Sequence, residues 1–532
     1  MKKKYNTQPI FQNLDNSSGG ADVSGVTATA EDVDEGKVFV NSSGTEVTGI
    51  STYKSDYTTL NTLVGNTTAT AADVDLGKYF VKSDGTQGTG SSTYKSDYTA
   101  LNTLVGQTTA TASDVAQGKL FVASDGTQTT GTASAGGSDA DFIKMVERPV
   151  NATITVPSGV TKIGQHVFQD WRDLQNITLP NSITIIDGHA FYNCTNLALT
   201  SLPSGLTAIG NYAFYSCTSL ALTALPSSLT SIGNSAFNGC TNLALTALPS
   251  SLTSIRNNAF VSCASLALTA LPSGLTSIGE SAFQNCTSLA LTALPSSVTT
   301  SIGQYTFYGC TGLTTMSLAD LPSSVTSIGS NAFNGCTNLT SVSLPSTITN
   351  ISERAFYNCE NLEQINLPNG LTTIGRSSFD HCYKLNLSSL PNSITTIGQG
   401  AFGGTLISLT ALPSSLTTIN TSAFFGCTNL AITDFPSGLT SIGQEIFSGC
   451  TGLTNLTFHS GITSIGYIAF NHCTGLTTVT FEGKPNSIHN NAFISCTNLT
   501  TINCPWSSGA VSGAPWGATN ATIVYDYVPP TT

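Results

Sequence analysis

A phenylalanine followed three residues later by a cysteine recurs about every 23 residues over most of this chain, and this repeat constrains the fold more than any other feature. The pairs include Phe191/Cys194, Phe214/Cys217 and, near the end, Phe493/Cys496. A fixed period in this range is typical of a solenoid, because each repeat can bury its apolar side only against its neighbours. The sequence therefore predicts a stack of coils, and such a stack is usually a binding surface.

One repeat, residues 202–220, reads LPSGLTAIGNYAFYSCTSL and predicts short strands separated by turns. Leu206 and Ile209 indicate a short strand, and Gly210 marks a turn. We expect the segment around Phe214 to form a single helical or 3₁₀ turn. The proline that follows each strand ends the pairing.

Departures from this unit predict irregular coils. Trp171 stands where the first cysteine belongs, as a coil exposed on one side allows. The cysteine and one residue are missing after Phe402, so we expect a loose or kinked coil there. Extra residues before Phe307 and Phe333 predict loops.

Thirteen of the fourteen cysteines occupy the same place in successive repeats, which predicts a column of buried thiols. Neighbouring coils would lie about 4.8 Å apart, so a disulfide between coils is not excluded by distance. Reduced thiols are favoured, since the packing role needs no oxidation. Cys504 lies outside the column and is expected to be the accessible one.

A different repeat, with a period of 41, occupies residues 26–135 and occurs three times. In the first copy, residues 37–40 alternate as a strand, 41–44 have turn chemistry and 45–48 return, which predicts a β-hairpin. Residues 53–65 predict a short helix with one apolar stripe. That stripe would serve self-association or pack onto its own hairpin.

The organisation we predict has five parts. They are a flexible leader or anchor at 1–25, three hairpin repeats for attachment at 26–135, a linker at 136–147, the solenoid at 148–503, and a C-terminal cap at 504–532.

The solenoid repeat, Leu-Pro-x-Ser-Leu-Thr-x-Ile-Gly-x-x-Ala-Phe-x-x-Cys-x-x-Leu, resembles the BspA-like class of leucine-rich repeats. That resemblance implies a right-handed coil of about 15 repeats with short parallel strands, used for adhesion or recognition without catalysis. It supplies no binding residues. The 41-residue repeat, with Thr-Ala-Thr-Ala-x-Asp-Val and Gly-Lys-x-Phe-Val, resembles modules of structural proteins of tailed phages, and this implies a virion component.

Composition and motifs argue against several other functions. Only 9% of the 532 residues are charged, the net charge is −12, and no basic cluster follows Lys2–Lys4, so nucleic-acid binding is not expected. No apolar segment suits a signal peptide or a membrane helix, so we expect synthesis in a cytoplasm and no membrane contact. The six histidines are scattered and no phosphate loop or zinc motif occurs, so we expect no catalytic, metal or cofactor site.

Charged and aromatic residues gather in one part of the solenoid. Between residues 180 and 340 only Asp187, Arg256, Glu280 and Asp320 are charged. Repeat proteins bind through positions that depart from their consensus, so we expect the binding site at 353–384. The alternative is that these repeats have diverged and present a solvated face. The candidate residues are Arg354, Tyr357, Glu360, Glu363, Arg376, Asp380, His381, Tyr383 and Lys384.

Two functions remain open from the sequence. The first is a non-enzymatic phage fibre or decoration protein at the virion surface. Its N-terminal region would bind a capsid or tail protein and could form a dimer or trimer, and its solenoid would bind a host cell-surface protein or glycan. The second is an adhesin of the BspA-like class at a bacterial cell surface.

Overall fold

A computed structural model describes residues 152–156 and 158–528, together with the backbone of six short strands nearer the N-terminus. These six strands form three antiparallel hairpins, and in the first of them Val38 is paired with Thr48. The hairpin prediction is confirmed, whereas the helix expected at 53–65 lies outside the described residues. The six strands are β1 (Val38–Val40), β2 (Glu46–Thr48), β3 (Tyr79–Val81), β4 (Gln87–Thr89), β5 (Leu120–Val122) and β6 (Gln128–Thr130).

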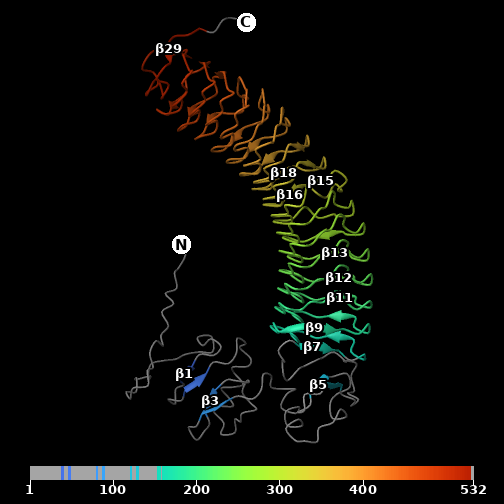
Figure 1. The fold of residues 1–532 in the computed structure, drawn as a ribbon. Helices are drawn as coiled ribbons and strands as arrows, with labels where there is room; N and C mark the ends of the chain where they lie inside the picture. Colours follow the sequence, from blue (N-terminus) through green and yellow to red (C-terminus); the bar gives the residue numbers. More distant parts are fainter. Residues whose placement is uncertain are drawn as a thin grey trace, which may run out of the picture. The chain divides into compact units, whose positions relative to one another are not determined.

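The described part from residue 152 onward is a solenoid of short parallel strands, as predicted (Figure 1). Nearly every coil gives one two-residue strand to a ladder along one face, in which isoleucine lies beside isoleucine. The ladder has three parts, from Ile163 to Ile278, from Ile328 to Ile419 and from Ile442 to Ile488. Between the first two parts, the coil that carries the inserted Thr300 has no strand and pairs forward only through a bridge between Ile302 and Ile328. The strands are β8 (Lys162–Ile163), β10 (Ile185–Ile186), β11 (Ala208–Ile209), β12 (Ser231–Ile232), β13 (Ser254–Ile255), β14 (Ser277–Ile278), β16 (Ser327–Ile328), β18 (Asn350–Ile351), β20 (Thr373–Ile374), β21 (Thr396–Ile397), β22 (Thr418–Ile419), β23 (Ser441–Ile442), β25 (Ser464–Ile465) and β27 (Ser487–Ile488).

A second set of parallel strands forms only in some of the coils. Coils such as 339–345, which read Leu-Thr-Ser-Val-Ser-Leu-Pro, form a strand here, whereas coils such as 220–226, which read Leu-Ala-Leu-Thr-Ala-Leu-Pro, do not. The second ladder is therefore broken into three groups. They are β7 (Ala152–Thr155) with β9 (Leu174–Thr178); β15 (Thr315–Ser317), β17 (Ser341–Ser343) and β19 (Gln364–Asn366); and β24 (Asn455–Phe458), β26 (Thr478–Phe481), β28 (Thr501–Asn503) and β29 (Thr522–Val524).

The segment around each core phenylalanine is a series of turns, so the predicted helical turn is wrong. In the coil of Phe214, the amides of Tyr212, Phe214 and Ser216 donate to carbonyls of the next coil. The amides between them donate three residues back within the same coil, as from Tyr215 to Tyr212. Tyr212 and Ser216 have φ values of 56° and 57°, and left-handed residues at such positions prevent a continuous helix.

The core is a single stack of fifteen buried phenylalanine rings. Neighbouring rings lie 5.0 to 5.8 Å apart between centroids, and their planes are within 18° of parallel. Since the rings touch only the rings of adjacent coils, the core can lengthen coil by coil without a central domain. The rings are those of Phe168, Phe191, Phe214, Phe237, Phe260, Phe283, Phe307, Phe333, Phe356, Phe379, Phe402, Phe424, Phe447, Phe470 and Phe493.

Each of the thirteen column cysteines is buried and donates its thiol to the carbonyl of the core phenylalanine one coil earlier, as Cys286 does to Phe260 at 3.0 Å. The burial prediction is confirmed for the column. The expectation that Cys504 is accessible is wrong, because this thiol is also fully buried. Burial raises the pKa of the Cys504 thiol to about 12.

The coil after Phe402 is not loose. Thr405 takes the place of the cysteine, is fully buried, and donates its hydroxyl to the Phe402 carbonyl at 2.8 Å. The Phe402 ring stacks 5.5 Å from Phe379, as in regular coils. The turn that follows Thr405 is instead one residue shorter than in regular coils, and Ile407 fills the apolar position at its end.

The last described coil continues the stack with different residues. Strand β29 pairs in parallel with β28, and the carbonyl of Trp516 accepts from the Phe493 amide at 2.9 Å. Trp516 is fully buried, and Trp506 packs 5.1 Å from the Phe481 ring. These two indoles cover apolar surface that would otherwise be exposed at the end of the stack.

Candidate binding surface

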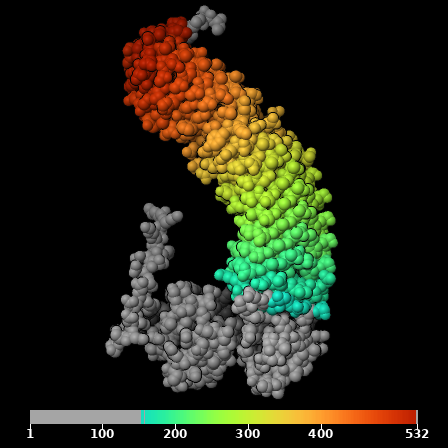
Figure 2. Space-filling model, in the orientation of Figure 1, coloured from blue at the N-terminus to red at the C-terminus, as the bar shows by residue number. Residues whose placement is uncertain are grey.

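Three positions in each coil face outward beside the core: the residue after the phenylalanine, the one after that, and the residue after the cysteine. At the second and third of these positions most coils hold Ser, Thr, Asn or Gly, whereas the first position varies and is also tyrosine at Tyr192, Tyr215 and Tyr308. The coils between residues 353 and 384 depart from this pattern at His381 and Tyr383, and they carry Tyr357 at the first position. On the face in view in Figure 2 the coils make one continuous surface, so a departure of this kind alters its chemistry locally.

Tyr357, His381 and Tyr383 form a connected group of rings across two coils. The Tyr357 and His381 rings are 5.2 Å apart and tilted, and the His381 and Tyr383 rings meet edge to face at 5.5 Å. The guanidinium of Arg354 lies 5.7 Å from the centroid of Tyr357, within the range of a cation–π contact. Tyr383 is 47% exposed, so this group offers a partner both flat apolar area and hydrogen-bonding groups.

Asp380 lies beneath these rings. Its Oδ1 is 2.9 Å from His381 Nδ1, and partial burial raises the pKa of the Asp380 carboxyl against the lowering effect of His381. The next coil holds Gly403 here, where a Cβ would approach Asp380 Oδ1 to 2.6 Å. A Cβ on Gly404 would lie 3.4 Å from the Tyr383 ring. Gly403 therefore makes room for the carboxylate of the preceding coil, whereas the Gly404 distance is that of an ordinary van der Waals contact.

The remaining candidate residues lie around this group. Lys384 pairs with Glu363 of the preceding coil at 3.7 Å, and both side chains are more than half exposed, so the pair contributes little to stability. Glu360 and Arg376 are exposed. Within 158–528, no hydrogen bond or ion pair joins either side chain to the ring group.

Two exposed apolar residues in the following coils were not among the sequence candidates. Leu406 is 38% exposed and Phe425 is 50% exposed. Leu406 occupies the position of Tyr383 one coil later, and Phe425 follows its core phenylalanine as Tyr357 does. For Leu406 the signal is an apolar residue at a position that most other coils fill with Thr, whereas Phe425 has no such signal because Val261 and Ile494 occupy the same position. We call the combined surface the 354–425 patch: Arg354, Tyr357, Asp380, His381, Tyr383, Leu406 and Phe425.

A second aromatic group lies in the first coils. The His166 and His189 rings stack at 4.7 Å, and His189 stacks on Tyr212 at 4.9 Å. Beside them Tyr192 stacks on Tyr215 at 4.8 Å. His166 and His189 lie in neighbouring coils and share the position two residues before the core phenylalanine. Burial, and to a lesser extent His166, lowers the pKa of His189.

The chemistry available at these surfaces is that of binding. Burial raises the pKa of the Cys217 and Cys450 thiols because it disfavours the thiolate, and a protonated thiol is a poor nucleophile. Among residues 152–156 and 158–528, no three His, Cys, Asp or Glu side chains come together as metal ligands would. The same residues include no helix able to cross a membrane.

Comparison with known proteins identifies the repeat. Residues 150–267, 209–320, 300–431 and 417–512 match the family described as BspA type leucine rich repeat region, and together they span more than half of the chain. A comparison with curated protein sequences gives no match.

The solved structures similar to this chain include the following three. A leucine-rich repeat protein from Bacteroides ovatus is 23% identical, with 70% of this chain and 92% of that one covered and a TM-score of 0.42. A leucine rich cell surface protein from Faecalibacterium prausnitzii is 24% identical, with 74% and 93% covered and a TM-score of 0.36. The pneumococcal vaccine antigen PcpA is 18% identical, with 78% and 100% covered and a TM-score of 0.37.

Proposed function

This chain belongs to the BspA-type leucine-rich repeat family, and from that premise we propose that it is a non-enzymatic recognition protein that presents its solenoid to a partner at a cell surface. The partner is a surface protein, and the contact is the 354–425 patch. The protein acts as an adhesin, with the hairpin repeats holding it at its own surface.

The observation that carries this proposal is the concentration of unusual side chains in one run of coils. From residue 206 to 298 the only charged residues are Arg256 and Glu280, whereas the 354–425 patch combines Arg354, Asp380 and exposed aromatic and aliphatic groups. Exposed Tyr and Arg are the side chains enriched at the energetic centres of protein interfaces. Keeping Tyr383 and Phe425 exposed has no benefit for folding, which favours a role in binding.

The test is a variant in which Arg354, Tyr357, Arg376 and Tyr383 are all changed to Ala. Fluorescently labelled wild-type and variant proteins are applied to intact epithelial cells and to intact bacterial cells, and bound protein is measured by flow cytometry. We expect the wild type to bind one class of cell and the variant to bind at least about tenfold more weakly, since interface centres lose 2 kcal/mol or more on truncation. The thermal melt should change little, because all four side chains lie outside the core.

A matched control uses the equivalent positions of a uniform coil. Ser281, Gln284 and Thr287 correspond to Arg354, Tyr357 and Tyr383. Changing these three to Ala should leave cell binding unaltered. Equal binding by the patch variant and the wild type would refute a binding role for the patch. These coils would then be diverged repeats that present a solvated face.

The virion fibre is a second candidate, and one observation favours it. The 41-residue repeats form backbone hairpins, and their sequence resembles modules of tailed-phage structural proteins. In that case the N-terminal region binds a capsid or tail protein, as a dimer or trimer, and the solenoid binds the host surface.

Mass spectrometry of purified phage particles and of peptides released from intact bacteria by protease distinguishes the two locations. Recovery in the particles alone would locate the protein at the virion surface rather than at the bacterial surface. Recovery from the bacterial surface alone would exclude the fibre. Recognition by the 354–425 patch is compatible with either outcome and is tested separately.

A further inference from the structure

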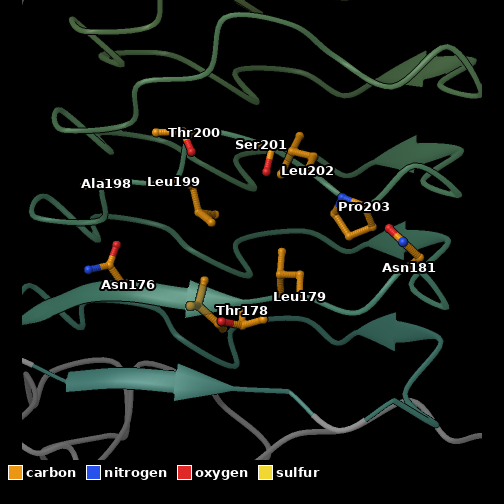
Figure 3. Close-up of a pocket in the computed structure, with 11 residues that line it drawn as sticks. Asn176, Thr178, Leu179, Asn181, Ala198, Leu199, Thr200, Ser201, Leu202 and Pro203 are labelled. Carbon is orange, nitrogen blue, oxygen red and sulfur yellow. The ribbon is translucent and has the colours of Figure 1, made fainter.

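A groove separates strand β9 from the segment that follows it one coil later. Residues 176–181 form its lower side and residues 198–203 its upper side (Figure 3). Its volume is about 400 Å³, within the range of small-molecule sites. The groove is distinct from the 354–425 patch and lies near the beginning of the solenoid.

The groove exists because two kinds of coil meet at this point. Residues 174–180 have the strand-forming pattern, whereas residues 197–203 have the pattern Leu-Ala-Leu-Thr. Between these two coils the Ala198 amide donates to the carbonyl of Gln175, which lies 23 residues earlier. In the next coil the Ala221 amide donates to the carbonyl of Leu199, which lies only 22 residues earlier. The backbones therefore change register by one residue, and the segment 199–203 does not continue the ladder of β7 and β9.

The sides of the groove are polar and uncharged. Asn176, Thr178 and Asn181 lie along the lower side, and Thr200 and Ser201 lie along the upper side. Their amide and hydroxyl groups can both donate and accept hydrogen bonds. No Asp, Glu, Lys or Arg is among the residues that line it.

Three leucines also contribute to the lining. Leu199 is buried, and Leu179 and Leu202 are partly exposed. In Figure 3 Leu199 lies between Asn176 and Thr200. A mainly polar, uncharged lining with some leucine surface complements a neutral ligand that has hydroxyl rims and C–H faces.

We propose that this groove is a binding site for a neutral saccharide of one or two sugar units. An anionic ligand would call for Arg or Lys and a metal cation for carboxylates, and the lining has neither. The groove is open to solvent, so the affinity should be weak, with a Kd of about 1 mM.

The test is saturation-transfer NMR on the full chain with glucose, galactose, mannose, N-acetylglucosamine, lactose and maltose. N-acetylneuraminic acid and a short neutral Ser/Thr peptide serve as comparison ligands. The blocking variant is Thr200→Arg, which places a long side chain in the groove. The matched control is Thr223→Arg, at the equivalent position one coil later, where neighbouring coils share one pattern.

We expect at least one neutral sugar to receive saturation from the wild type and from Thr223→Arg, and its signal to fall at least about tenfold in Thr200→Arg. Three results would each overturn the proposal: no signal from any neutral sugar, equal loss in both variants, or stronger signals from the acidic sugar or the peptide. Circular dichroism verifies that both variants are folded. Because cell binding by the 354–425 patch is measured on other variants, failure here leaves the proposed function intact.

Discussion

The coils at 206–298 and the coils at 353–425 have the same interior except at Thr405, and they have different surfaces. In both, the phenylalanine rings stack and the cysteine thiol donates one coil back, at 3.0 Å for Cys286 and 3.1 Å for Cys382. Outside, the first region is nearly uncharged, whereas the second carries ion pairs, exposed rings and a glycine, Gly403, that makes room for Asp380. The interior specifies the fold, and the outward positions are free to change.

This separation has a physical reason. A core residue contacts the same residue of two neighbouring coils, so a change in one coil disturbs three. An outward residue after the phenylalanine or the cysteine contacts mainly solvent. Binding chemistry can therefore be placed on any coil without loss of the stack.

The largest effect that we expect is the unfolding of both regions at high pH, through ionisation of the column thiols. Burial raises the pKa values of ten of the thirteen column thiols above the ordinary value of 9.0, among them Cys310 and Cys359. Below that value neither the folded nor the unfolded chain loses thiol protons. As the pH rises past about 9, only the unfolded chain loses them, and each such thiol removes about 1.4 kcal/mol of stability per pH unit.

Summed over the column, this loss exceeds the 5–15 kcal/mol of stability that is typical of a domain. We expect cooperative loss of the circular dichroism signal between about pH 9 and pH 11. Replacing Cys217, Cys240 and Cys263 by Ala should shift the loss to higher pH. A protein that keeps its full stability at about pH 11 would contradict the buried column.

The second-largest effect that we expect is the loss of stability when a core phenylalanine of either region is replaced by alanine. Phe283 and Phe356 each stack between two rings, at 5.7 and 5.8 Å for the first and 5.2 and 5.4 Å for the second. Phe283→Ala and Phe356→Ala should each destabilise by about 3–5 kcal/mol, because each opens a cavity in the stack.

Urea unfolding followed by circular dichroism measures both variants. Long arrays can unfold in parts, so the transition midpoints are compared rather than a single free energy. If the two substitutions destabilise the protein by amounts that differ by more than about 2 kcal/mol, the interiors of the two regions are not equivalent.

The repeat could be predicted from the sequence because it depends on local patterns that recur. The phenylalanine stack, the buried cysteines and the isoleucine strands follow from spacing alone. The left-handed turns around Phe214 could not be predicted, since Tyr212 and Ser216 have no intrinsic preference for positive φ, and the next coil's carbonyls hold them there. Burial of Cys504 likewise depends on the next coil, since its amide donates to the Val524 carbonyl of β29.

The candidate surface was predictable only in part. Charge and aromatic content indicated residues 353–384, but Leu406 and Phe425 are apolar and read as core until their positions in the coil are known. The groove at β9 was not foreseen at all. It depends on a one-residue change in register between two coils of equal length, which no single repeat displays.

The smallest effect we predict concerns Thr405, which interrupts the thiol column beside the 354–425 patch. Its hydroxyl donates within its own coil to Phe402, and it contacts the Cys427 sulfur at 3.4 Å. Among the core phenylalanines from Phe168 to Phe470, Phe379 is therefore the one whose carbonyl receives no thiol from the next coil. Thr405→Cys should restore that bond and raise stability by about 0.5–1 kcal/mol.

Thr405→Ala is the control for this substitution, because it removes the hydroxyl without adding a thiol and should lower stability by about 1 kcal/mol. Urea midpoints of the wild type and both variants rank the three proteins. A Thr405→Cys protein that is less stable than the wild type would show that the shortened turn after residue 405, rather than the missing thiol, sets the geometry of this coil. The sequence of the turn would then be what distinguishes this region from the uniform coils at 206–298.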